Sequence, residues 1–167
     1  MVKPPPTIAL CAIFFIMLGC ASEDRVAKLE KQVDELGAES KKNQAAADFD
    51  LQGKCAKDSR GWFNENWSRD KDTILLDYSN HYNRAQNKCF VLVELHYTLD
   101  KSGSWTGDMM LWDVYENTKY GNFAENHMIS FNPTVSTHDE VVTCEVLNNR
   151  CKTVAEFNDL VVPYLKN

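Results

Sequence analysis

The chain has 167 residues, with 24 acidic and 18 basic side chains and a net charge of -6. A composition that is 44% hydrophobic and 11% aromatic is too apolar for a disordered chain. The mean hydropathy of -0.42 is too polar for a multi-span membrane protein. The acidic balance supplies no basic surface for nucleic acid, so we expect one globular domain without a nucleic-acid partner.

Residues 1–19 have the pattern of a secretory signal peptide. An apolar run of eleven residues, from Ile8 to Leu18, follows Lys3 and precedes the small residue Gly19. This run is shorter than the roughly 20 residues that a helix needs to span a bilayer. A cationic end, an apolar core and a small residue are the three parts of an export signal. We therefore expect export and removal of this segment.

The sequence Met17-Leu18-Gly19-Cys20 resembles the lipobox of bacterial lipoproteins. In that family the cysteine is acylated and becomes the new N-terminus, which implies that Cys20 is a lipid anchor. Several acyl chains together hold a protein stably on a membrane. Ala21, which is not Asp, implies sorting to the outer membrane, facing the periplasm. An ordinary secretory signal with an incidental Cys20 is the alternative.

The cysteines predict two disulfides. Of the six cysteines, Cys11 lies in the signal and Cys20 at the anchor, which leaves Cys55, Cys89, Cys144 and Cys151. An even number in an exported domain indicates disulfides, for which three connectivities exist. We favour the pairs 55–89 and 144–151, because Asn148-Asn149 predicts a hairpin turn between the last two. No pair has the Cys-x-x-Cys spacing of a zinc ribbon or redox site.

Residues 20–47 are predicted to be the lipid anchor and a helical stalk. The apolar residues Val26, Leu29, Val33 and Leu36 fall three and four apart, the a/d pattern of a coiled coil. The segment resembles the short N-terminal coiled coil of some envelope lipoproteins, which implies a weak homo-oligomer through residues 22–36. A solvated single helix is the alternative. Gly37 and the polar run 39–44 predict a hinge before the domain.

Residues 48–167 contain all sixteen aromatic side chains of the mature chain. Asp48 is a predicted N-cap for a helix that ends near Trp67. Alternating apolar residues predict a strand over 89–99, a turn over 100–104 and a return strand over 106–116. Further strands are predicted at 120–124, 141–146 and 150–152. Thr153 and Glu156 match a capping box and begin a terminal helix, in which Pro163 predicts a kink or an early end.

This element order predicts an α+β fold. We expect an antiparallel sheet of about four to six strands, with the N-terminal and C-terminal helices packed on one of its faces and a helical stalk before them. The spacings of phosphate loops, zincin helices, nucleophile elbows and calcium loops do not occur in the sequence. We therefore predict a non-catalytic protein without a cofactor or metal.

Glu94 and His96 form the first candidate site. They are two residues apart on one predicted strand and are expected to face Asp113 on the next. A carboxylate that orients an imidazole serves general-base catalysis or metal binding, so these residues would be the centre of an envelope hydrolase or metal-dependent enzyme. Cross-strand pairing on a half-exposed sheet surface is the structural alternative.

Two further groups are candidate binding residues. His81 and Asn83, within the run 80–83, are predicted to lie on a loop that presents a binding edge or hydrogen-bonds its own backbone. Trp105 is predicted at a hairpin tip, where it binds a sugar ring or a partner protein or folds back on the sheet. His127 and His138 are expected to be isolated surface residues.

The favoured interpretation is an outer-membrane lipoprotein whose disulfide-stabilised periplasmic domain acts as a binding module for another envelope protein or a cell-wall component. The first alternative is the enzyme that would use Glu94, His96 and Asp113. The second is an assembly protein that associates through residues 26–36.

Overall fold

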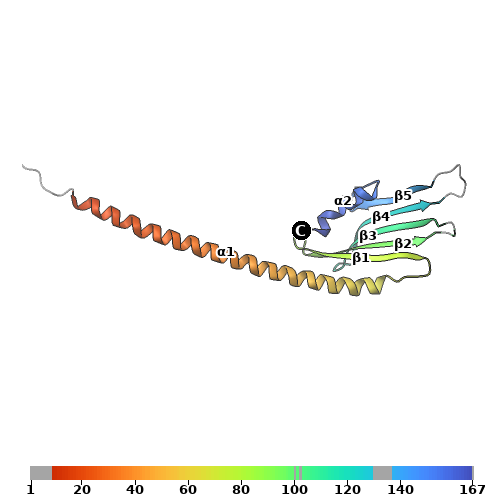
Figure 1. The fold of residues 1–167 in the computed structure, drawn as a ribbon, viewed down its shortest axis with the longest axis horizontal. Coiled ribbons are helices and arrows are strands. Elements are labelled where there is room, and N and C mark those ends of the chain that lie inside the picture. The colour runs from red at the N-terminus through yellow and green to blue at the C-terminus, as the bar shows by residue number, and fades with distance from the viewer. Residues whose placement is uncertain (1–8, 100, 102, 130–136, 167) are drawn as a thin grey trace, which may run out of the picture. The chain divides into compact units, whose positions relative to one another are not determined.

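A computed structural model describes residues 9–99, 101, 103–129 and 137–166, and for residues 9–22 it describes the backbone alone. Within these residues lie one long helix, a six-stranded antiparallel sheet and a C-terminal helix, which confirms the α+β class (Figure 1). The elements are α1 (Ala9–Asn66), β1 (Thr73–Asn83), β2 (Lys88–Thr98), β3 (Trp105–Asp113), β4 (Thr118–Met128), β5 (His138–Val146), β6 (Asn149–Arg150) and α2 (Val154–Leu165).

The chain divides into two units, Met1–Ala47 and Asp48–Asn167. The candidate lipidation residue Cys20 and the whole predicted signal peptide, residues 1–19, lie outside the residues whose side chains are described. Among the described residues, no helix has a stretch both long enough and apolar enough to cross a bilayer.

Helix α1 does not begin where the sequence predicts a helix start. Asp48 lies inside α1, and its carboxylate accepts a hydrogen bond from Arg84 Nη1 at 3.0 Å in place of capping a helix end. Gly37 and residues 39–44, where the sequence predicts a hinge, are helical too, so the helix is not interrupted there. The Ala, Lys, Gln and Glu residues around that glycine are strong helix formers, which outweighs its cost of about 1 kcal/mol. The end at Asn66 agrees with the prediction.

The six strands follow one another in the sheet in chain order, and every neighbouring pair is antiparallel. The predicted hairpin of residues 89–99 and 106–116 is confirmed as β2 and β3, with Phe90 opposite Asp113 and Thr98 opposite Trp105. This register decides which predicted site residues meet.

Strand β1 corrects the prediction of a loop at residues 80–83. These residues form the end of β1 and pair with Lys88–Val91 of β2. Helix α1 supplies polar partners for this edge strand: Gln52 Oε1 accepts from Tyr82 N at 2.8 Å, and Gln52 Nε2 donates to Asn80 Oδ1 at 3.2 Å. Residues 80–83 thus belong to an edge strand, and the Asn80 side chain and the Tyr82 backbone bind α1. Their polarity therefore reflects contacts with a helix and not a loop conformation.

The two helices cover opposite faces of the sheet, which corrects the expectation that both pack on one face. Cys89, Val91 and Val93 belong to clusters completed by side chains of α1, whereas Phe90 and Leu92 contact the cluster completed by α2. Successive side chains of a strand point to opposite faces. Strand β2 is apolar on both faces because each face is covered by a helix.

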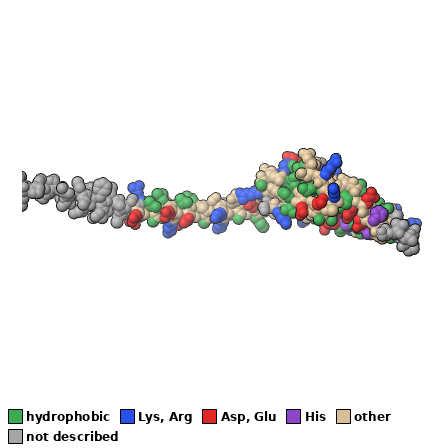
Figure 2. Space-filling view, turned by 90° about the horizontal axis from the view of Figure 1, so that it is seen from above, with side chains coloured by type: hydrophobic (Ala, Val, Ile, Leu, Met, Phe, Trp, Pro, Cys, Tyr) green, Lys and Arg blue, Asp and Glu red, His purple; other side chains and the backbone are tan. Residues whose placement is uncertain are grey.

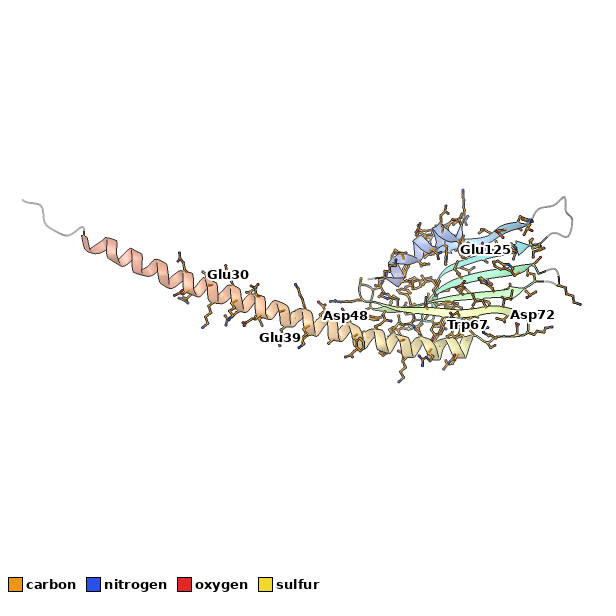
Figure 3. All side chains as sticks on the ribbon, in the orientation of Figure 1. Glu30, Glu39, Asp48, Trp67, Asp72 and Glu125 are labelled. Carbon is orange, nitrogen blue, oxygen red and sulfur yellow. A yellow bond between two sulfur atoms is a disulfide. The ribbon has the colours of Figure 1, made fainter. Side chains whose placement is uncertain are left out.

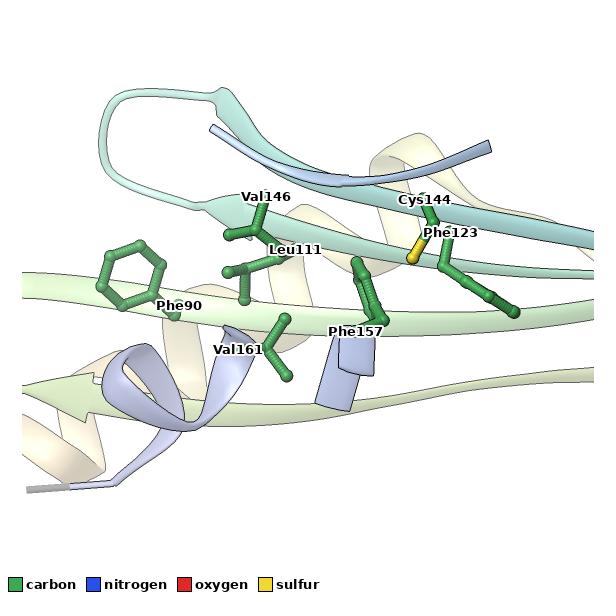
Figure 4. Close-up of a cluster of buried hydrophobic side chains, with 7 residues drawn as sticks. All are labelled: Phe90, Leu111, Phe123, Cys144, Val146, Phe157 and Val161. Atoms are coloured by element: carbon green, nitrogen blue, oxygen red, sulfur yellow. The ribbon is translucent and has the colours of Figure 1, made fainter. Parts of the chain in front are cut away.

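The core beneath α2 is the larger of these clusters (Figure 4). Its buried members are Phe90, Leu111, Phe123, Cys144, Val146, Phe157 and Val161. Thr153 caps α2 as predicted: its side chain accepts from Glu156 N at 3.1 Å, and Glu156 Oε2 accepts from Lys152 N at 2.7 Å. The helix continues through Pro163 to Leu165.

Both favoured disulfides are present. Cys55 of α1 is bonded to Cys89 of β2, and Cys144 of β5 is bonded to Cys151 just after β6. The first attaches the C-terminal part of α1 to the sheet, and the second closes the β5–β6 hairpin. Both crosslinks lie within packed clusters of the domain.

Candidate functional site

Helix α2 covers only one end of its face of the sheet. The other end of this face has polar and aromatic side chains. Strand register and side-chain alternation bring together residues that we call the open half-face: Asp77, Glu94, His96, Trp105, Gly107, Glu125, His127 and Asp139. Helix α2 packs on the opposite end of the same face, over Phe90, Leu111 and Val146. Glu125, at this end of β4, is labelled in Figure 3.

A tryptophan between two histidines forms the centre of the open half-face. The ring centroid of Trp105 lies 4.9 Å from that of His96 and 5.2 Å from that of His127, and both imidazoles are inclined by only 17° to the indole. His96 comes from β2 and His127 from β4, the strands on either side of β3. The three rings therefore form a stack across three strands, which we call the His–Trp–His stack.

Two local features hold the indole in this position. Gly103 makes the preceding turn with a φ of 91°, a conformation that glycine adopts at little cost. The buried Ser104 then binds both neighbouring strand ends: its carbonyl accepts from Leu99 N at 2.9 Å and its hydroxyl accepts from Ile129 N at 3.0 Å. Trp105 therefore starts β3 in a fixed register.

Gly107 leaves room for the stacked rings because it has no side chain. A Cβ atom at this position would lie 2.8 Å from Trp105 Cζ3 and 3.3 Å from His96 Cδ2, closer than packed carbon atoms approach. The indole and one imidazole thus lie directly over the glycine backbone. The sequence places Trp105 at a hairpin tip, and the structure shows it folded over the sheet and stacked against the two imidazoles.

Each histidine of the stack contacts a carboxylate. His96 Nε2 lies 3.4 Å from Glu94 Oε1, and His127 Nδ1 lies 2.5 Å from Asp139 Oδ1. The side chains of Glu94 and Asp139 are 47% and 66% exposed, so these acids remain accessible to a ligand. A ligand at the stack would therefore meet carboxylate oxygens on both sides.

Further negative charge surrounds the stack. Asp77 is directly opposite Glu94 on the neighbouring strand, and Glu125 is opposite Gly107. Like charges directly opposite each other in a sheet are destabilising. Among the described strand residues on the open half-face, none is Lys or Arg. The surface thus has four carboxylates whose mutual repulsion a cationic ligand would relieve.

Asp108 lies beside this region on the other face of β3, opposite Leu95. Burial raises the pKa of its carboxyl above the ordinary value of 3.8, while the charges of His96 and Lys119 act in the opposite direction. Asp108 therefore lowers stability at neutral pH, where it must be charged in a partly desolvated position.

The predicted grouping of Glu94, His96 and Asp113 is half wrong. Glu94 and His96 meet, but Asp113 is opposite Phe90, four to six residues along β2 from them. Asp113 is fully buried and accepts a hydrogen bond from Lys88 Nζ at 2.6 Å. This bond is the main cause of the raised pKa of Lys88. Asp113 is therefore part of a structural ion pair and takes no part in the site.

His81 and Asn83 also lie away from the open half-face, at the far end of β1. His81 is opposite Phe90, in the half that α2 covers. Asn83 is buried, and its Nδ2 donates to Pro163 O of α2 at 2.8 Å while its Oδ1 accepts from Gln86 N at 3.1 Å. Asn83 thus joins the β1–β2 turn to α2, in agreement with the structural alternative.

His127 is the site residue that the sequence analysis missed, because it was expected to be isolated. Its partners come from two other strands, Trp105 of β3 and Asp139 of β5. The sequence could have predicted this position from the turn at residues 114–117. A β3–β4 hairpin that turns there places Trp105 opposite His127.

Among the described residues, no group of three or more His, Cys, Asp or Glu side chains has the geometry to hold a metal ion. No protein-family model, curated protein or solved structure matches the chain.

Proposed function

We propose that this protein is an outer-membrane lipoprotein, anchored through Cys20, whose domain of residues 48–167 is a non-catalytic binding module in the periplasm. The resemblance of residues 17–20 to a lipobox supports the anchor. The two disulfides support an oxidising compartment. The ligand surface in this proposal is the open half-face.

The observation that carries the proposed binding role is the His–Trp–His stack with a carboxylate beside each imidazole. An ordered aromatic cluster on an exposed sheet surface offers rigid contact area at low entropy cost. Its flanking acids and the lack of Lys or Arg on the described open half-face favour a ligand with amine or guanidinium groups. A basic segment of another envelope protein and an amine-bearing cell-wall fragment both have this chemistry.

The anchor is tested by labelling cells that express the chain with radioactive palmitate. We expect label in the full-length protein and in Cys11→Ser, and loss of label in Cys20→Ser. Cys11 is the matched control because it is a second cysteine of the same N-terminal segment. Equal labelling of Cys20→Ser, or absence of label from all three, would overturn the lipoprotein assignment.

The binding surface is tested with the full chain and a tetra-arginine peptide, with tetra-glutamate as the ligand control. We expect NMR shifts centred on the Trp105 indole N–H, weaker at high salt because exposed charges are screened. The double variant Glu94→Gln and Asp139→Asn should lower affinity about tenfold.

Glu65→Gln with Asp159→Asn is the matched control for charge, since both carboxylates are exposed and lie outside the open half-face. An equal loss of affinity in this control would show that only net charge matters. A soluble cell-wall fragment used in place of the peptide distinguishes the two ligand sources. Hydrolysis of either probe that depends on His96 would support the enzyme alternative and contradict a non-catalytic role.

A further inference from the structure

Among the described residues, another exposed surface lies on α1, before residue 48. Four side chains on one side of the helix, Val26, Leu29, Val33 and Leu36, have exposed fractions of 52%, 60%, 65% and 65%. Figure 2 shows hydrophobic side chains among charged ones along the helix. Burying such side chains stabilises an association in proportion to the apolar area removed from water. We call these four residues the seam.

The spacing and type of the seam residues specify a partner. In heptad terms, Val26 and Val33 are at a positions, and Leu29 and Leu36 are at d positions. A β-branched residue at a with leucine at d favours parallel two-stranded coiled coils over trimers and tetramers. The identical seam of a second copy satisfies this requirement.

Charges beside the seam agree with a parallel arrangement. Arg25 is at a g position and Glu30 at the following e position, and in a parallel pair these two positions of different copies lie next to each other. In an antiparallel pair e positions face each other, so Glu30 would meet its own equivalent. The outer side of the helix is polar, and there Lys31 Nζ lies 3.8 Å from Glu35 Oε1.

We infer that residues 25–37 pair with the same segment of a second copy as a parallel, in-register two-stranded coiled coil. Ser40, Asn43, Ala47 and Asp50 occupy the next a and d positions, and none of them is a large apolar residue, so the pairing ends after Leu36. Two heptads are fewer than the three or four typical of stable coiled coils. The association is therefore weak in dilute solution and depends on local concentration.

A cysteine placed in the seam tests the inference on the purified full chain at about 0.5 mM, a concentration comparable to the effective concentrations that tethering produces. In a parallel in-register pair, Val33→Cys lies beside its own equivalent, whereas Lys31→Cys points away from the partner. We expect intermolecular disulfides in Val33→Cys to form at least fivefold faster than in Lys31→Cys. Equal rates would overturn the inference.

Sedimentation equilibrium gives the stoichiometry. We expect a monomer–dimer equilibrium for the full-length protein and a shift to monomer in Leu29→Asp. A trimer or tetramer, or a Leu29→Asp variant that associates as strongly as the parent, would contradict the inference. Leu29 lies outside the packed clusters of residues 48–167, so an unchanged thermal midpoint separates lost association from misfolding. Because each variant is compared with the parent in the same preparation, these results test the seam alone and not the lipidation of Cys20.

Discussion

The face of the sheet on which α2 packs has two ends, one covered by the helix and one open. Both ends are built from the same strands, but they differ in composition. At one end Phe90 and Leu111 are fully buried under the helix. At the other end His96 and Trp105 remain partly exposed among carboxylates. The covered end therefore supplies folding free energy, and the open end presents fixed polar and aromatic groups. A few residues along one strand are enough to separate a covered apolar end from an open polar end.

The largest effect is expected at the covered end. Phe157 is fully buried and its ring centroid lies 5.7 Å from that of Phe123. Phe157→Ala should lower the free energy of unfolding by about 3–5 kcal/mol, because it leaves a cavity in the core. Urea unfolding measures this loss. Val154→Ala, at a 40% exposed position of the same helix, should cost less than about 0.5 kcal/mol. Similar losses in both variants would contradict the assignment of the core.

Loss of the buried ion pair should have the next largest effect. Lys88→Met leaves the carboxylate of Asp113 buried and without its main partner, which should cost about 2 kcal/mol in thermal unfolding. The cost is limited because Asp113 still accepts a hydrogen bond from Tyr115 N at 3.0 Å. Adding Asp113→Asn to Lys88→Met should recover part of the loss. A double variant less stable than Lys88→Met would show that the carboxylate is stabilised in another way.

At the open end, Trp105→Ala should cost only about 1 kcal/mol of stability. Its main consequences should be a loss of peptide binding and a shift of the His96 and His127 ring resonances, with His81 unchanged as an internal control. Gly107→Ala retains the indole but removes its space, so it should weaken binding in the same way. Unchanged His96 and His127 resonances in Trp105→Ala would contradict the stacked arrangement.

The smallest effect is a gain in stability that depends on pH. The folded state holds the pKa of Asp108 above its unfolded value, so folding is penalised at neutral pH and the penalty disappears as pH falls below about 3.8. Asp108→Asn should therefore raise the midpoint by about 2 °C at pH 7 and by nothing at pH 3. Asp159→Asn, at an exposed position of α2, is the control. A gain that is the same at both pH values would show that burial of charge is not the cause.

Local signals in the sequence predicted the parts of the fold that depend on neighbouring residues. Strand β2, the cap at Thr153 and the short disulfide 144–151 follow from alternation, hydroxyl capping and a tight turn, all within a few residues. The turn itself lies at Leu147-Asn148, one residue before the expected Asn148-Asn149. Strand β1 was missed because its polar residues have partners 28 to 30 residues away on α1. Nothing within the segment itself reveals those partners.

The candidate site shows the same division. The sequence predicts that Glu94 and His96 lie together, because they are two apart on one strand and this spacing fixes their common face. The error at Asp113 was one of register: a hairpin that turns near residue 101 places Met109, and not Asp113, opposite Glu94. The third strand of the stack, β4, is joined to β3 by a second hairpin. Each further strand adds a register that must be known before side chains can be assigned to a common surface.

The bond between Cys55 and Cys89 also determines how the domain responds to mechanical tension. A pull that arrives from the N-terminal side reaches Cys55 and passes through the sulfur atoms directly to the start of β2. Residues 56–88, which include the end of α1 and all of β1, lie inside the closed loop and bear no load along the chain. Tension applied at the N-terminal end of the chain would thus bypass β1, which the disulfide shields from forces that would otherwise pull it from the edge of the sheet.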